Sequence, residues 1–139
     1  MSEYGSDDGR WFYRPTSLPT LNFHQFEPHI RFSRAGEYSN YGRGVHHLRM
    51  EDEKTGDFMG GIEWHKDTGE IIGVSTEPQY RRLGVAATLF HEAKDIAREQ
   101  GLVEPVHSAD RSTMGNKWAK AVGGKLPKRK KLSDFPNLN

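Results

Sequence analysis

The sequence predicts a layered α/β (α+β) fold, in which a mostly antiparallel central sheet is followed by one long and one short helix. Two observations predict the sheet: segments between residues 45 and 76 carry strand-like apolar patterns, and turns at 54–57 and 67–69 separate them. A third observation predicts the long helix, because apolar residues recur every three or four positions after Gly84.

Five strands are expected along the chain. They span residues 29–34, 45–52, 58–65, 70–76 and 102–107. Alternation in the third strand predicts a core face made of Phe58, Gly60, Ile62 and Trp64, with Met59, Glu63 and His65 on the other face. The Gly-rich segment 36–44 is predicted to be a loop.

Two helices are expected, one after the fourth strand and one after the fifth. The apolar stripe of the long helix consists of Val85, Ala86, Leu89, Ala93, Ile96 and Ala97. Gly101 is expected to end this helix as a C-cap. The short helix is expected to begin at Ser112 or Thr113 and to end at Gly123-Gly124.

Residues 1–25 are predicted to be an extended N-terminal arm, and residues 26–139 a single domain with a basic C-terminal tail. The arm carries several aromatic residues, which is unusual for a disordered segment. Two interpretations stay open: an arm that packs on this domain or on a neighbouring molecule, or an irregular first strand with a flexible leader. The tail from Lys125 has room for one strand.

Composition excludes several classes of function. The chain has no cysteine, which excludes disulfides, thiolate metal sites and an acyl-cysteine intermediate. Because no apolar run approaches the roughly 20 residues that span a membrane, and the N-terminus is unlike a signal peptide, we expect a cytoplasmic protein without a membrane partner. The net charge of +1 gives little ground for nucleic-acid binding, although the basic tail leaves it open as the alternative to a solvated tail.

No metal site is expected. His46 and His47 point to opposite faces of one strand, so they cannot chelate one metal together. His107 and Arg111 each have two interpretations, a structural role at a strand end or in a loop, or contact with a ligand, and the structural role is favoured for both.

The most informative segment joins the fourth strand to the long helix. Pro78 ends the strand, since the residue before a proline is pushed toward extended geometry. The motif Arg81-x-x-Gly84-x-Ala86 then opens the helix, whose first backbone N–H groups have no intrahelical partner. Such N–H groups bind anions, small residues let a bulky phosphate approach, and arginine can fork onto phosphate oxygens.

The order of these elements, together with this motif, resembles the GNAT superfamily of acyl-CoA-dependent N-acyltransferases. The segment Thr76-Glu77-Pro78-Gln79-Tyr80-Arg81-Arg82-Leu83-Gly84-Val85-Ala86 is similar to the family signature V-x-P-x-x-R/Q-x-x-G-x-G/A, with Thr76 in place of the usual Val. The likeness runs from about Val45 to Gly124. A second segment, from His107 to Gly124, is similar to a variant found in small GNAT-like proteins encoded by bacteriophages.

The resemblance implies acetyl-CoA as the acyl donor. It also implies that the fourth and fifth strands splay apart at a bulge, where pantetheine hydrogen-bonds to the fourth strand and a backbone N–H polarises the acyl carbonyl. The implied cofactor-binding residues are Val74, Ser75, Thr76, Arg81, Arg82, Leu83, Gly84, Val85 and Ala86. Gly73 fits such a bulge; alternatively, it leaves room for an aromatic side chain from the next layer.

Direct transfer to an amine needs a base, because deprotonating a lysine-like amine at pH 7 costs about 4–5 kcal/mol. Glu63 is the first candidate, since it shares a strand face with His65. Glu77 is the second, since it ends the fourth strand beside the implied acyl site. Each is alternatively a solvated carboxylate. Ser108 is the third catalytic candidate, assisting the leaving thiolate through water.

Two departures from the family pattern leave two functions open. The tyrosine that protonates the leaving thiolate in the family falls on Ala119, and segment 35–44 is too short for the helices that shape the acceptor site. The first function is an N-acetyltransferase that acts on a small-molecule or protein amine. The second is a catalytically weak or inactive GNAT-like binding module. Its partner would be a second copy or a phage assembly, reached through the N-terminal arm in the host cytoplasm or the virion.

Overall fold

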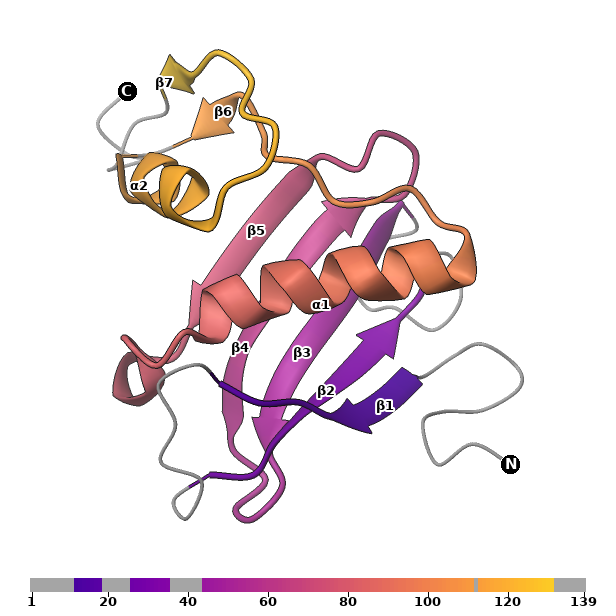
Figure 1. The fold of residues 1–139 in the computed structure, drawn as a ribbon, viewed down its shortest axis with the longest axis vertical. Coiled ribbons are helices and arrows are strands. Elements are labelled where there is room, and N and C mark those ends of the chain that lie inside the picture. Colours follow the sequence, from indigo (N-terminus) through magenta and orange to yellow (C-terminus); the bar gives the residue numbers. More distant parts are fainter. Residues whose placement is uncertain (1–11, 19–25, 36–43, 112, 132–139) are drawn as a thin grey trace. The chain divides into compact units, whose positions relative to one another are not determined.

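The computed structural model describes residues 12–18, 26–35, 44–111 and 113–131. The chain divides into two compact units, residues 1–105 and residues 106–139. We call them the sheet unit and the C-terminal unit (Figure 1).

The sheet unit contains five strands: β1 (Phe12–Pro15), β2 (Pro28–Ser33), β3 (Val45–Asp52), β4 (Phe58–His65) and β5 (Ile71–Thr76). Every neighbouring pair is antiparallel, and the order in the sheet is β1-β2-β3-β4-β5 (Figure 1). The predicted antiparallel sheet and its layered α+β class are therefore confirmed.

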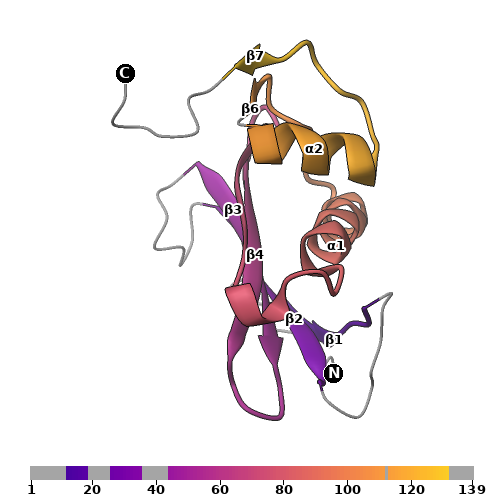
Figure 2. The ribbon, with the colours of Figure 1, turned by 90° about the vertical axis from the view of Figure 1, so that its left-hand side faces the viewer.

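The helix α1 (Val85–Gln100) covers one face of this sheet (Figure 2). The predicted stripe packs inward, with Leu89, Ala93 and Ile96 fully buried. Gly101 ends the helix in left-handed geometry (φ 70°), as its lack of a Cβ allows.

The core between sheet and helix centres on Trp64. Its ring stacks on Phe32, with ring centroids 5.7 Å apart, and also packs against His46 at 5.3 Å. The Nδ1 atom of His46 accepts the backbone N–H of Ala35 at 2.9 Å. His46 is thus a buried, neutral member of the core, whereas His47 lies on the opposite sheet face as predicted.

A bulge in β4 places Phe58 on the face of the sheet opposite to the one predicted. The pairing of β4 with β3 shifts between Gly60 and Phe58, which leaves Met59 as an extra residue. Met59 is fully buried, whereas Phe58 is half-buried and its ring centroid lies 4.8 Å from the guanidinium carbon of Arg49. The prediction that Phe58 belongs to the core face was wrong, because the inserted residue shifts the alternation by one.

The strand predicted at 102–107 was also wrong, since that segment forms only an isolated bridge at Val106. The carbonyl of Val103 instead accepts a hydrogen bond from the indole N–H of Trp64 at 3.1 Å. Pro105 has no backbone N–H to donate to a neighbouring strand. Consequently β5 is the last strand of its sheet among the described residues.

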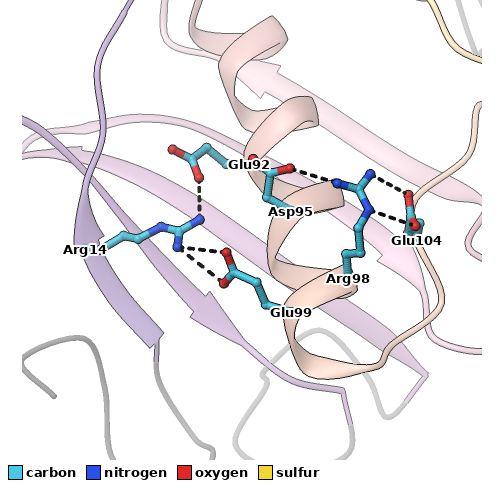
Figure 3. A network of polar contacts seen from close by, with 6 residues as sticks. All are labelled: Arg14, Glu92, Asp95, Arg98, Glu99 and Glu104. Carbon is cyan, nitrogen blue, oxygen red and sulfur yellow. Dashed lines mark hydrogen bonds and ion pairs between the residues drawn. The ribbon is translucent and has the colours of Figure 1, made fainter. Parts of the chain in front are cut away.

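Part of the predicted N-terminal arm forms β1, which pairs with β2. Figure 3 shows how Arg14 on this strand reaches α1, where it lies 2.7 Å from Glu92 and 3.4 Å from Glu99. The remainder of the arm (1–11 and 19–25) and most of the predicted loop (36–43) lie outside the described residues.

The C-terminal unit contains β6 (Asp110–Arg111), α2 (Thr113–Val122) and β7 (Lys130–Lys131). The two short strands are parallel, which confirms one strand in the basic tail. Gly123 has φ 82° and donates its N–H to Ala119, so α2 ends where the Gly-Gly pair predicts. Ser112, one of the two predicted caps, lies outside the described residues.

Candidate functional site

The loop from β5 to α1 leaves the start of the helix open. After a short 3-10 turn at Pro78–Tyr80, Arg82 and Gly84 take left-handed backbone angles, with φ 67° and 87°. The carbonyl of Gly84 accepts the N–H of Thr88 at 2.9 Å, which makes Gly84 the N-cap. Within the described residues no side chain caps this end, and the first turn carries no acid, so its amides can receive an anion.

Gly60 seats the helix start against the sheet. A Cβ at this position would lie 2.5 Å from the carbonyl oxygen of Ser75 and 2.9 Å from Cγ1 of Val85. Only a glycine lets the first residue of α1 pack this closely on β4 and β5. Gly60 therefore fixes where the open amides lie relative to β5.

A second bulge lies in β5. Glu63 pairs with Gly73 while Trp64 pairs with Ile71, so Ile72 is an extra residue, and 55% of it is exposed. The bulge expected beside Gly73 is confirmed. Among the described residues the neighbour of Gly73 is not an aromatic side chain but Glu63, whose Oε1 atom would lie 3.3 Å from a Cβ at Gly73.

Glu63 therefore places its carboxylate over Gly73, next to the bulge. The side chain is half-buried, and this burial raises the pKa of Glu63 above its ordinary value. A carboxylate with a raised pKa next to a strand edge can accept a proton from a neighbouring group.

The other residues proposed for the cofactor line β5 and the loop. Val74, Ser75 and Thr76 pair with Ile62, Gly61 and Gly60, so they alternate between the two sheet faces. Arg81 and Arg82 are exposed, whereas Val85 is buried under the helix start.

Glu77 links the sheet to the loop through its backbone. Its N–H donates to Met59 at 2.9 Å, and its carbonyl accepts the N–H of Tyr80 at 2.9 Å. The side chain is half-buried, and its catalytic role stays a prediction.

Ser108, His107 and Arg111 belong to the C-terminal unit. The ring of His107 hydrogen-bonds to the carbonyl of Gly123 at 2.7 Å. Arg111 is buried and donates to the carbonyls of Ser108 and Pro127, the latter at 2.8 Å. These hydrogen bonds agree with a structural role for His107 and Arg111, although His107 holds the end of α2 and does not end a strand. The catalytic role of Ser108 stays a prediction.

Sequence reasoning missed Tyr80, which is buried at the base of the loop and hydrogen-bonds to Asp57 at 3.1 Å. One signal was present: Tyr80 is the single aromatic residue in the polar stretch between Glu77 and Arg82. Its partner could not be found from sequence, since Asp57 lies in a turn 23 positions earlier.

The described residues contain no group of three or more His, Cys, Asp or Glu side chains placed to hold a metal ion. They also contain no helix that is long and apolar enough to cross a membrane.

A family model of known proteins agrees with this fold. The model of the acetyltransferase (GNAT) family matches residues 10–122. A crystal structure of an aminoglycoside acetyltransferase from an uncultured soil metagenomic sample is similar at a TM-score of 0.47 and 19% identity, over 68% of this chain and 66% of that one. The chain thus spans just under two thirds of the length of that structure. No curated protein sequence matches the chain.

Proposed function

The chain belongs to the GNAT acetyltransferase family, and we propose that it moves an acetyl group from acetyl-CoA directly to an amine. The observation that carries this proposal is the open start of α1. Gly84 is the N-cap, Arg82 and Gly84 have left-handed backbone, and the first turn carries no acid. Because no side chain of the described residues caps this end, its amides can bind a pyrophosphate.

The proposed cofactor contacts continue along β5. Arg81 and Arg82 are exposed beside the helix start and can approach phosphate oxygens. Because β5 is the last strand of its sheet in the described part of the chain, backbone groups between Val74 and Thr76 can hydrogen-bond to pantetheine. Acetyl-CoA would place its thioester near the bulge at Ile72.

Glu63 is the proposed general base. Its carboxylate takes a proton from the acceptor ammonium, and the amine nitrogen then forms a bond to the thioester carbon. The tetrahedral intermediate then collapses: its C–S bond breaks, the nitrogen gives up its second proton to water, and the CoA thiolate leaves and takes a proton from water. Glu77 is the second candidate for the base, and Ser108 is proposed to assist the leaving thiolate through water.

A second function is favoured by one specific observation. Ala119 stands where the family has its tyrosine acid, and this residue is only 1% exposed. A module that binds CoA without efficient turnover, and that docks on a partner or a second copy through its N-terminal segment, is the alternative proposal.

Calorimetry with acetyl-CoA tests the binding step common to both proposals. Acetyl-CoA at 100 times its Kd should stabilise the fold by about 2.7 kcal/mol. Gly84→Glu should abolish binding, since it places a carboxylate among the open amides. Gly101→Glu is the matched control, because it adds the same residue at the other left-handed cap of α1, where a Cβ would meet nothing within 4 Å.

The outcomes separate the proposals. If acetyl-CoA leaves the unchanged chain unaffected, cofactor binding is refuted. If both glutamate variants lose binding equally, the helix start is not the phosphate site. Binding without thiol release across a panel of amines would favour the non-catalytic module.

A further inference from the structure

The loop between β5 and α1 is anchored by one buried side chain. Tyr80 is 4% exposed, whereas Gln79, Arg81 and Arg82 are exposed. Its ring meets the ring of Phe26 edge-on, with centroids 5.4 Å apart and planes at 70°. This edge-to-face arrangement is favourable for two aromatic rings, so the contact holds the base of the loop.

The hydroxyl of Tyr80 reaches a different part of the chain, the turn between β3 and β4. It donates a hydrogen bond to Oδ2 of Asp57 at 3.1 Å. Burial, helped by the neighbouring Asp57 carboxylate, raises the pKa of Tyr80, so the phenol keeps its proton at neutral pH. The bond is therefore a charge-assisted one, which is stronger than a bond between neutral groups.

That turn is itself firmly held. The carboxylate of Asp52 is 2% exposed and accepts the backbone N–H groups of Glu27 at 3.1 Å and Lys54 at 3.0 Å. The N–H of Asp52 in turn donates to the carbonyl of Asp57 at 2.9 Å. The hydroxyl of Tyr80 is thus hydrogen-bonded to a turn that other hydrogen bonds already hold in place.

The loop needs such an anchor because its backbone is disfavoured two residues further on. Arg82 has φ 67°, a left-handed conformation that a side chain with a Cβ rarely adopts. Backbone of this kind persists only where the surrounding structure holds it. The buried Tyr80 and the seating of Val85 on Gly60 enclose this strained segment on both sides.

We propose that Tyr80 is a positioning residue of the cofactor loop. Its hydrogen bond to Asp57 and its ring contact with Phe26 hold residues 81–84 in the conformation that leaves the α1 amides open to pyrophosphate. The inference rests on the proposed function, but Tyr80 itself need not touch the cofactor.

Tyr80→Phe is the direct test, because it keeps the ring and removes only the hydroxyl. The Kd for CoA, measured by calorimetry, should rise about tenfold, which is the order of one hydrogen bond to a charged group. In the free protein, NMR order parameters of the backbone at residues 81–84 should fall. The KM for acetyl-CoA should rise while kcat stays unchanged.

Two controls separate positioning from a general loss of stability. Thr16→Val removes another hydroxyl-to-carboxylate bond, the one from Thr16 to Glu92, and should leave the Kd for CoA unchanged. Asp57→Asn keeps an acceptor for the phenol and should retain affinity, whereas Asp57→Ala should behave like Tyr80→Phe. The double variant Tyr80→Phe/Asp57→Ala should be no worse than either single variant.

An unchanged Kd and unchanged order parameters in Tyr80→Phe would overturn the inference. So would an equal loss of affinity in Thr16→Val. If the unchanged chain does not bind CoA, the proposed function fails, and the loop order parameters alone decide whether Tyr80 holds the loop.

Discussion

Glu63 combines three properties that a general base needs: a carboxylate beside the β5 bulge, partial burial and a raised pKa. Glu63→Gln keeps the shape of the side chain and removes the proposed base, so kcat should fall by about 10²–10³ while the Kd for CoA stays unchanged. Because burial raises this pKa, the acid limb of the rate profile should lie above the ordinary pKa of 4.5.

Glu77→Gln is the comparison variant for Glu63→Gln. The kcat of both variants and of the unchanged protein is measured by thiol release from pH 5 to 9. A larger loss of kcat in Glu77→Gln than in Glu63→Gln would assign the base to the end of β5. Equal activity in all three proteins would show that neither carboxylate takes the amine proton.

The two buried histidines of β3 make stability sensitive to acid. Burial, helped by the cations Arg34 and Lys66, lowers the pKa of His46 to about 4, and burial beside Arg49 lowers that of His47 to about 4. Their ordinary pKa is 6.5, so the unfolded chain binds more protons between these two values. Stability is therefore fully present above pH 6.5 and is lost as pH falls toward 4.

Each histidine should contribute a slope of up to about 1.4 kcal/mol per pH unit in this window. Urea unfolding at pH 7.0, 6.0 and 5.0 measures the combined slope. His47→Gln should roughly halve it, since one buried titrating group is gone. A slope unchanged by His47→Gln would mean that this ring is accessible to protons in the folded state.

The packing of α1 on the sheet depends on the two close contacts at Gly60. Gly60→Ala introduces a Cβ that meets backbone at 2.5 Å, so the free energy of unfolding should fall by about 1–3 kcal/mol. The helix start should also shift, and the affinity for CoA should fall with it.

Gly61→Ala is the matched control for Gly60→Ala in the same strand. A Cβ at Gly61 would lie nearest to Nε2 of His47, at 3.2 Å, and this side-chain atom can move. Urea unfolding and CoA calorimetry on both variants give the comparison. If Gly61→Ala loses as much stability and CoA affinity as Gly60→Ala does, the losses come from replacing any glycine in β4. They then do not come from the close packing of Val85 on Gly60.

The attachment of β1 to α1 depends on a partly buried arginine. Arg14 keeps 22% of its side chain exposed and contacts Glu92 and Glu99 (Figure 3). Arg14→Gln should lower the free energy of unfolding by about 1 kcal/mol, because it leaves the partly buried Glu92 without its cation. Arg98→Gln should have no measurable effect, since Arg98 is exposed to solvent, which screens its pairs with Asp95 and Glu104.

Local sequence pattern predicted the elements whose limits are set by local chemistry. Residues 45–52 and the end of the long helix matched their predicted bounds, because alternation and Gly101 are local signals. The bulge at Met59 was not predicted, since nothing in the segment Phe58 to Trp64 shows which residue the partner strand will skip. The false strand at 102–107 failed for a tertiary reason: the indole of Trp64 takes the carbonyl of Val103.

The same division holds for the candidate site. The Gly84 motif could be predicted because it depends on a short run of residue types. The bulge beside Gly73 was implied only by the resemblance to the GNAT family, since Gly73 alone also fits close packing. The position of the Glu63 carboxylate over Gly73 depends on the register between β4 and β5. The anchor at Tyr80 depends on a contact with a distant turn.

Almost all of the buried apolar side chains in the described residues belong to the sheet unit, and Ala119 is the exception. The proposed phosphate amides, the β5 edge and Glu63 also lie in this unit. The segment after α1 is tied back within it through the hydrogen bond from the indole of Trp64 to the carbonyl of Val103. A fragment ending at residue 105 should therefore keep its core and its cofactor loop.

We expect the fragment of residues 1–105 to unfold cooperatively in urea and to gain stability on adding acetyl-CoA, as the full chain does. Its turnover should fall, because the fragment lacks Ser108, the proposed helper of the leaving thiolate. Circular dichroism, urea unfolding and calorimetry on the fragment and the full chain make the comparison. A folded fragment that no longer responds to acetyl-CoA would show that residues 106–139 supply contacts that the loop at Gly84 cannot replace. A fragment that does not fold would show that the sheet unit needs the C-terminal unit to complete its core.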